Sequence, residues 1–164
     1  MENKTNSRRT EGLLALFDMH SGFLARALDG ISAEDMQNRL NTQANHMAWL
    51  AGSMVQQRYT MVAETNPGLK QTGHDLFSNN KGIQEDAQYP SIAEYIKDWE
   101  YITPLARKAL AEVDDTKLDS ELTMGTMKMS FYDMVVFTLY REASLVGQLA
   151  LWRRLLGYPA LKYD

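Results

Sequence analysis

The chain has 164 residues, of which 45% are hydrophobic and 23% charged, as is typical of one globular domain with a sizeable core. Its 17 Lys and Arg are outnumbered by 21 Asp and Glu, so a net charge of −4 offers no basic field for nucleic acid. The absence of cysteine excludes disulfides, thiolate metal sites and a cysteine nucleophile. No run approaches the ~18 apolar residues of a membrane span, and no signal-peptide pattern opens the chain. We therefore expect a cytoplasmic, single-domain protein, residues 1–164, with a flexible tail at residues 1–9.

The first predicted helix begins at Thr10 or Glu11, runs to about Leu28 and ends at Gly30. Asp18 lies within about 40° of its apolar stripe at ~100° per residue, so this carboxylate either flanks solvent or pairs inward. The stripe has three- and four-residue spacing and consists of Leu14, Phe17, Ser21, Leu24 and Leu28.

The second predicted helix extends from about Ala44 to Thr65, where the turn sequence Asn66-Pro67-Gly68 stops it. One face mixes polar and apolar residues: His46, Trp49, Leu50, Ser53, Gln57, Thr60, Met61 and Glu64. A second face is purely apolar: Ala48, Ala51, Val55 and Val62. Residues 69–90 then show no sustained period, which predicts a long irregular connection of the kind that is often functional or mobile.

A capping box of Ser91 and Glu94 starts the third predicted helix, which Pro104 should kink. Its inward residues are Ile92, Tyr95, Ile96, Trp99, Ile102, Ala106, Leu110 and Val113. Residues 114–129 are rich in turn signals and alternate around Gly125, so they suggest a short extended ribbon. Four long helices with broad apolar stripes predict an all-α fold, a four-helix bundle whose long connections leave room for crossovers.

The last predicted helix runs from Ser130 to Gly157, with a capping box at its start and Pro159 beyond its end. We expect its core face to consist of Met134, Phe137, Thr138, Arg141, Leu145, Gln148 and Trp152. Because an unpaired buried guanidinium is prohibitively costly, Arg141 must extend its charge to solvent, meet a carboxylate or face a wet cavity. Asp18 is the expected ion-pair partner, ahead of Glu64, and a ligand-facing role for Arg141 is the alternative.

Common catalytic and nucleotide-binding motifs are absent from the sequence. His20, His46 and His74 fall on separate segments, and no two have the i, i+4 spacing that brings imidazoles to one metal. Polar His46, Ser53 and Gln57 beside Trp49 are what a small-molecule site in an apolar bundle looks like. The residues therefore leave open a ligand pocket and a purely structural core.

Two segments resemble the DinB/YfiT-like family of four-helix bundles. Residues 45–54 read N-H-M-A-W-L-A-G-S-M, and residues 141–159 read R-E-A-S-L-V-G-Q-L-A-L-W-R-R-L-L-G-Y-P. The family's segments typically read N-H-x-x-W-x-x-G-H and H-E-x-x-H-x-G-Q, followed by R-R-x-x-G. The resemblance implies a divalent metal held by three histidines, activities that include metal-dependent thiol transfer, and a homodimer. The two apolar faces of the second helix also favour a homodimer.

The family's metal ligands fall on Ser53, Arg141 and Leu145, so all three imidazoles are replaced. We expect no metal and no cofactor, because a hydroxyl, a guanidinium and an isobutyl group do not donate like imidazole. A guanidinium still binds a carboxylate or phosphate, so anion binding remains open. The candidate pocket residues are His46, Trp49, Ser53, Gln57, Arg141, Glu142, Leu145 and Gln148.

Three functions are compatible with these residues, and whether the protein is an enzyme stays open. The favoured one is non-catalytic binding of a small, anionic molecule, with no nucleic-acid or membrane partner. The second is a metal-independent transferase in which Arg141 holds an anionic group and Glu142 or His46 is the base. The third is a structural or interaction protein without a ligand, in which Arg141 and Asp18 simply pair.

Overall fold

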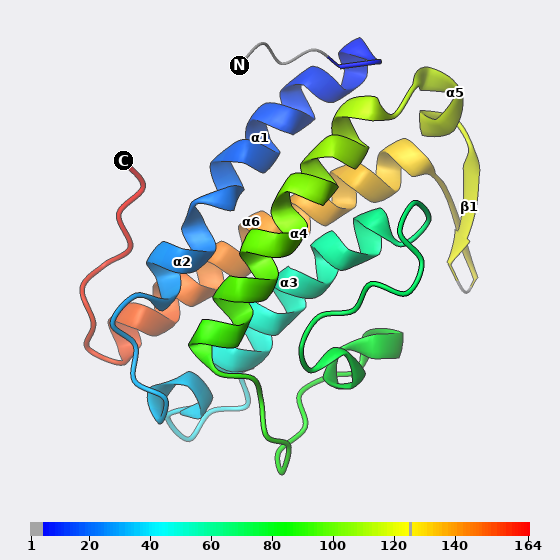
Figure 1. Cartoon of the computed structure of the whole chain (residues 1–164). Coiled ribbons are helices and arrows are strands. Elements are labelled where there is room, and N and C mark those ends of the chain that lie inside the picture. Colours follow the sequence, from blue (N-terminus) through cyan, green and yellow to red (C-terminus); the bar gives the residue numbers. More distant parts are fainter. Residues whose placement is uncertain (1–4, 125) are drawn as a thin grey trace.

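The computed structural model describes residues 5–124 and 126–164, which form a mainly helical fold with one small two-stranded sheet (Figure 1). The helices are α1 Glu11–Ser21, α2 Phe23–Leu28, α3 Met47–Val62, α4 Ile92–Glu112, α5 Asp115–Leu118 and α6 Phe131–Leu155. The antiparallel strands are β1 Glu121–Met124 and β2 Met127–Ser130. The predominance of helix matches the expected class, and the strands form the expected ribbon, whose central Gly125 lies outside the described residues.

The helix ends follow the capping signals closely. Ser91 with Glu94 and Ser130 with Asp133 both form reciprocal capping boxes, at the starts of α4 and α6. The first predicted helix is interrupted at Gly22, which separates α1 from α2. α4 passes through Pro104 as one helix.

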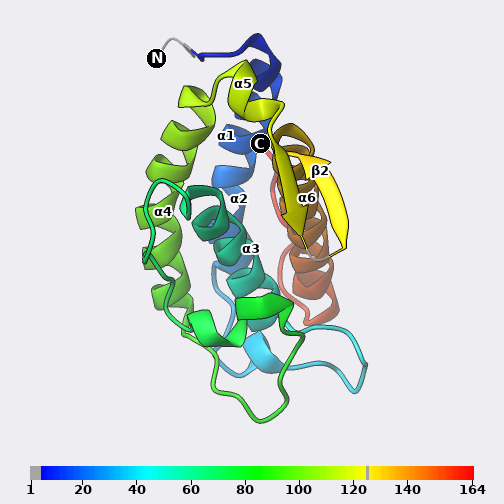
Figure 2. The same cartoon turned by 90° about the vertical axis from the view of Figure 1, so that its right-hand side faces the viewer.

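α1 and α6 run in one direction, and α3 and α4 run in the other (Figures 1 and 2). α3 packs against α4 and α6, and α1 packs against the same two helices. Because α3 and α4 are parallel neighbours, residues 63–91 must return along the length of α3. No helix in the described parts of the chain is long and apolar enough to cross a bilayer.

The returning connection is irregular, as expected, but it is packed onto α3. The Phe77 ring lies so close to Gly52 that a Cβ on this glycine would stand 2.1 Å from the ring. Gln71 Nε2 donates to the Gly52 carbonyl at 3.1 Å and to Gln56 Oε1 at 2.8 Å. A glycine at position 52 is therefore what allows this segment to cover the helix.

The second apolar face of α3 is an internal surface. Ala48, Ala51, Val55 and Val62 are all buried within the chain itself. This face therefore gives no support for a homodimer, because helix α3 lies between its neighbours and the 63–91 connection. The expectation of a dimer itself remains a prediction.

The core face of α6 is rotated from the predicted one by roughly 90°, at ~100° per residue. Phe137 is 55% exposed and Gln148 is also exposed, while Glu142 is fully buried. The helix is apolar on several sides, so its periodicity alone did not select the inner one. The buried residues are Val135, Thr138, Leu139, Glu142, Leu145, Val146, Leu149, Trp152 and Arg153.

Residues 5–9, the described part of the predicted tail, contact the rest of the chain. Asn6 donates its backbone N–H to the Ala111 carbonyl at 3.0 Å, and Ser7 Oγ donates to Asp115 Oδ1 at 2.5 Å. Arg9 forms an ion pair with Asp119 at 2.6 Å. Residues 5–9 are thus fastened to the end of α4 and to α5.

Candidate functional site

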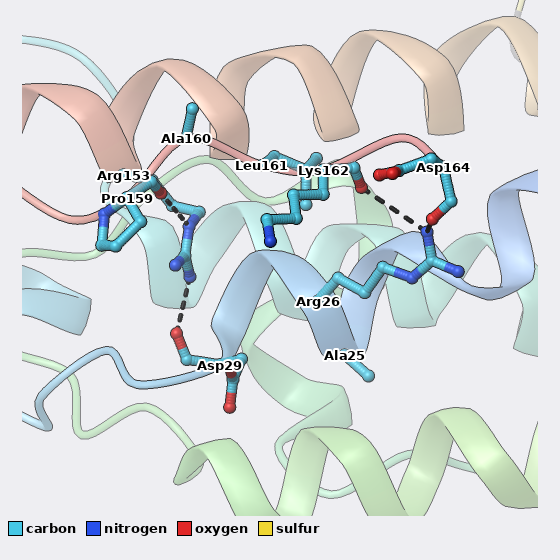
Figure 3. A pocket seen from close by; sticks show the side chains of 9 residues that line it. All are labelled: Ala25, Arg26, Asp29, Arg153, Pro159, Ala160, Leu161, Lys162 and Asp164. Atoms are coloured by element: carbon cyan, nitrogen blue, oxygen red, sulfur yellow. Dashed lines mark hydrogen bonds between the residues drawn. The ribbon is translucent and has the colours of Figure 1, made fainter.

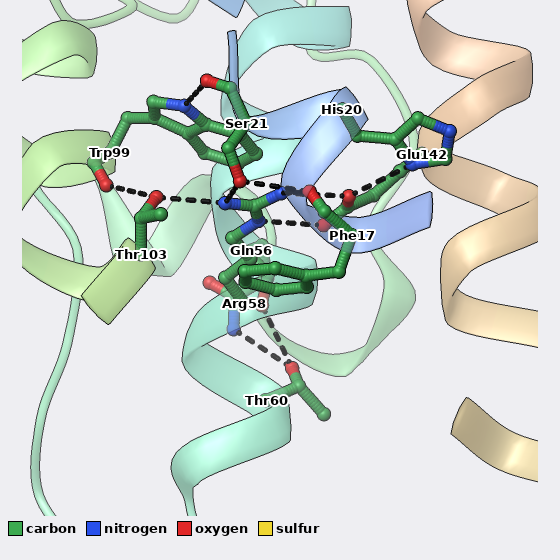
Figure 4. A network of polar contacts seen from close by, with 9 residues as sticks. All are labelled: Phe17, His20, Ser21, Gln56, Arg58, Thr60, Trp99, Thr103 and Glu142. Atoms are coloured by element: carbon green, nitrogen blue, oxygen red, sulfur yellow. Dashed lines mark hydrogen bonds and ion pairs between the residues drawn. The ribbon is translucent and has the colours of Figure 1, made fainter. Parts of the chain in front are cut away.

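A fully buried ion pair, which the sequence analysis missed, joins α3 to α6 (Figure 4). Arg58 Nε donates to Glu142 Oε1 at 2.9 Å, and Arg58 Nη2 donates to Glu142 Oε2 at 3.1 Å. Neither side chain has any exposed surface. This two-pronged geometry is the one in which guanidinium and carboxylate bind most strongly.

The other donors of Arg58 are satisfied by α1 and α4. Its Nη1 donates to Ser21 Oγ and to Thr103 Oγ1, each at 2.8 Å, and its Nη2 reaches the Phe17 carbonyl at 3.3 Å. The guanidinium is stacked between two rings, with its Cζ 3.8 Å from the Phe17 centroid and 3.7 Å from the Trp99 centroid. Every face of the charge is therefore occupied by protein.

His20 completes the network from α1. Its Nδ1 lies 3.4 Å from Glu142 Oε2, and the side chain is buried. Burial lowers the pKa of Arg58, whereas the hydrogen bonds and charge of Glu142 oppose that shift. With the Arg58 charge paired to Glu142 and its N–H groups used, this cluster has the chemistry of a structural core.

A sequence signal for Arg58 existed. It falls between Val55 and Val62 at the same three- and four-residue spacing as the apolar face of α3. A charged side chain in that stripe needs a buried partner, for the same reason that was given for Arg141. Glu142 was then the carboxylate on the core side of α6.

The predicted ion pair between Arg141 and Asp18 is wrong. Asp18 instead receives two hydrogen bonds from Arg107 on α4, Nε to Oδ1 at 2.8 Å and Nη2 to Oδ2 at 2.9 Å. Glu64, the second expected partner, pairs with Lys117 at 2.6 Å. Asp18 faces α4 because the core side of α1 is already filled by Leu14, Phe17 and His20.

Arg141 does lie beside Ser53, as the matched segments predict. Arg141 Nη2 donates to Ser53 Oγ at 3.2 Å, and the serine is buried on α3. Within residues 5–124 and 126–164, no carboxylate oxygen lies within 4.0 Å of the Arg141 guanidinium. Its Nε is buried and has no hydrogen-bond partner in the described chain.

A second unsatisfied donor lies one helical turn from Ser53. Trp49 Nε1 is buried and, among the described residues, has no acceptor. Leu145, one turn along α6 from Arg141, is buried as well. Buried donors without acceptors cost about 1–3 kcal/mol each, so each of these two calls for an explanation.

The remaining candidate residues have other surroundings. Glu142 belongs to the Arg58 pair, and Gln57 is only half-buried. Gln148 is exposed and donates within its own helix to the Ser144 carbonyl at 3.5 Å. The structure thus brings Ser53 and Arg141 together and assigns Glu142 to the core.

His46 caps the start of α3. Its Nδ1 accepts the backbone N–H of Trp49 at 3.1 Å, and its ring packs edge-on against Tyr89 at a centroid distance of 4.7 Å. The cap needs the lone pair of a neutral imidazole. Burial is the main cause that lowers the pKa of His46 below its ordinary 6.5.

This capping role predicts a pH dependence of stability. Because the pKa is lower in the folded chain, the unfolded state takes up the proton first, so the free energy of unfolding should fall as pH drops below about 6.5. Asn at position 46 keeps a cap but does not titrate. Urea unfolding of the parent and of His46→Asn between pH 8 and 5 should give the steeper decline in the parent. Equal slopes would exclude this role.

A cavity of about 700 Å³ lies apart from all eight candidate pocket residues (Figure 3). It is lined mainly by α2 and the C-terminal segment, residues 159–164. Arg26 Nη1 spans the two, donating to the Asp164 carbonyl at 2.8 Å, while Arg153 Nη1 donates to the Ala27 and Asp29 carbonyls at 2.9 and 2.7 Å. Arg26 thus binds a carbonyl group of the C-terminal segment, and Arg153 binds carbonyl groups at the end of α2.

The residues at the family's three ligand positions do not fit a divalent metal. Ser53, Arg141 and Leu145 present a hydroxyl, a cation and a hydrocarbon. In the described parts of the chain, no three His, Cys, Asp or Glu side chains come together as a metal site. No protein-family model and no curated protein matches this chain.

Proposed function

We propose that the protein is a DinB-like four-helix bundle with a long crossover connection, which has lost the family's metal centre and binds a small anion at Arg141. The order of packed helices α1, α4, α3 and α6 supports this reading. So does the contact between Ser53 and Arg141, two positions that the resemblance aligns with metal ligands. The cytoplasmic location expected from the sequence is part of the same proposal.

The observation that carries the proposal is a group of donors without an acceptor anion. Arg141 contacts a hydroxyl instead of a carboxylate, and its Nε lacks a hydrogen-bond partner among the described residues, as does Nε1 of Trp49, one helical turn before Ser53 on α3. A carboxylate or phosphate oxygen is an acceptor for both kinds of donor, and guanidinium binds it with two parallel hydrogen bonds. A small anion entering beside Ser53 would satisfy them.

Anion binding is testable with benzoate and inorganic phosphate as separate probes at constant ionic strength. A ligand that binds only the folded chain stabilises it by about 2.7 kcal/mol at one hundred times its dissociation constant, so the melting temperature should rise. Arg141→Met should abolish the rise. Arg8→Met, which removes an exposed cation from another segment, should leave it unchanged. No rise with either probe, or an equal rise in Arg141→Met, would reject the site.

The two other functions have less support. A transferase would need Glu142 or His46 as its base. Glu142 is bound by Arg58, and His46 Nδ1 accepts the Trp49 N–H, so neither group is free to take a proton from a substrate. For a purely structural Arg141, the partner expected was Asp18, which binds Arg107. Non-catalytic binding is therefore the function we favour.

A further inference from the structure

The cavity between α2 and the C-terminal segment results from the way in which the chain leaves α6. Gly157, with a φ of +86°, reverses the chain, and the Tyr158 N–H donates to the Arg153 carbonyl at 2.8 Å. Residues 159–164 then run beside α2 (Figures 1 and 3). They form one wall of the cavity, and α2 forms the opposite wall.

The C-terminal wall is held in place at several points. Leu161 is buried, and the Tyr163 ring packs edge-on against Phe23 at a centroid distance of 5.3 Å. Arg26 and Arg153 lie at opposite ends of the cavity and connect its two walls (Figure 3). The cavity is therefore formed by fixed contacts, as small-molecule sites usually are.

Arg153 is a buried charge without a counter-charge. The residue is only 6% exposed, and its hydrogen bonds all go to backbone carbonyl groups. Its Nη2 makes no hydrogen bond within residues 5–124 and 126–164, where no carboxylate oxygen lies within 4.0 Å of the guanidinium either. A buried guanidinium is normally balanced by an anion, and the cavity that it lines has room for one.

Lys162 adds a second cation at the same place. Its side chain extends between the guanidinium groups of Arg153 and Arg26 (Figure 3), and it forms no ion pair in the described parts of the chain. Asp29 and Asp164 also line the cavity, which leaves one positive charge in excess. The Asp29 carboxylate points away from Arg153 and Lys162. A ligand with a single negative charge would balance this excess.

The rest of the lining is hydrocarbon, from Ala25, Pro159, Ala160 and Leu161. The cavity volume of about 700 Å³ is that of a site for a small organic molecule. We propose that the cavity binds an amphipathic carboxylate, whose charged group lies between Lys162 and Arg153 and whose apolar body lies against these hydrocarbon groups. The proposal is independent of the anion site at Arg141, because the two share no residue.

Octanoate is a suitable probe, with 1-octanol as its uncharged counterpart of the same chain length. In an NMR titration of the isotope-labelled protein, octanoate should shift the amide signals of residues 159–162 and the methyl signal of Ala25. 1-Octanol should bind about tenfold more weakly or worse, the loss expected for one hydrogen bond between charged groups. Octanoate shifts confined to other segments, or equal affinity for the two compounds, would overturn the proposal.

Three variants locate the charge and the space that the ligand needs. Lys162→Met should weaken octanoate binding about tenfold, and Ala25→Trp, at an exposed position of α2, should abolish it by filling the cavity. Lys70→Met, which removes an exposed cation from the 63–91 connection, is the matched control and should bind as the parent does. Parent-like affinity in both Lys162→Met and Ala25→Trp would reject the cavity. Loss of octanoate binding in Arg141→Met instead would assign the carboxylate to the other site.

Discussion

Replacing Glu142 by Gln should lower the free energy of unfolding by about 3–5 kcal/mol, because it leaves the Arg58 charge buried without its counter-charge. The guanidinium is fully buried, so water cannot take over the role of the carboxylate. Urea denaturation monitored by circular dichroism measures the loss. A loss below about 1 kcal/mol, the range of exposed pairs, would contradict the buried ion pair.

Asp18→Asn is a matched control for this experiment. It makes an equivalent chemical change in a two-pronged pair with Arg107, but that pair is 40% and 35% exposed. Its loss should stay within about 1 kcal/mol. Combining Arg58→Met with Glu142→Leu should recover most of the stability, since apolar replacement of both partners removes the desolvation penalty as well as the attraction.

Changing Ser53, Arg141 and Leu145 together to His should create zinc binding with a micromolar or tighter dissociation constant, where the parent binds none stoichiometrically. Arg141 and Leu145 are four residues apart on α6, and Arg141 already touches Ser53 across the α3–α6 contact. Three imidazoles there would form the ligand set of a catalytic-type zinc site, with one position open. Titration against a zinc-competing dye measures the affinity.

The outcome of the zinc experiment bears on the proposed family resemblance. A variant with only Ser53→His should not bind, because one imidazole cannot hold the ion. Tight zinc in the parent would contradict the lost metal centre. A folded triple variant without zinc would mean that α3 and α6 do not keep the geometry that the matched segments imply.

The helices were predicted well because capping and turn signals lie within a few residues of each helix end. Capping boxes at Ser91 and Ser130 set two helix starts, whereas α3 ends at Val62, three residues before the predicted end at Thr65. The break at Gly22 escaped prediction, since a glycine inside an apolar period interrupts a helix only when tertiary packing favours it. The packed state of residues 69–90 also escaped, because it depends on the contact between Gly52 and the distant Phe77.

The candidate site was predictable only in part, for reasons that lie in α3 and α6. Both helices are apolar on more than one side, so periodicity does not identify the face turned toward the core. Ser53 was expected beside Arg141 only from the proposed family resemblance, whereas the partner of Arg58 depends on helix rotation. A rotation of α6 by one residue's angle exchanges Glu142 for Arg141 in the core, and no local signal fixes that angle.

Arg58 also couples the motions of the helices that surround it. Its hydrogen bonds reach α1, α4 and α6 from α3, so each of these four helices holds part of one buried charge. If any one of them detached, the guanidinium would lose partners that water must replace, and the remaining three would be destabilised with it. Opening is therefore coupled across the four helices, which behave as a single cooperative unit.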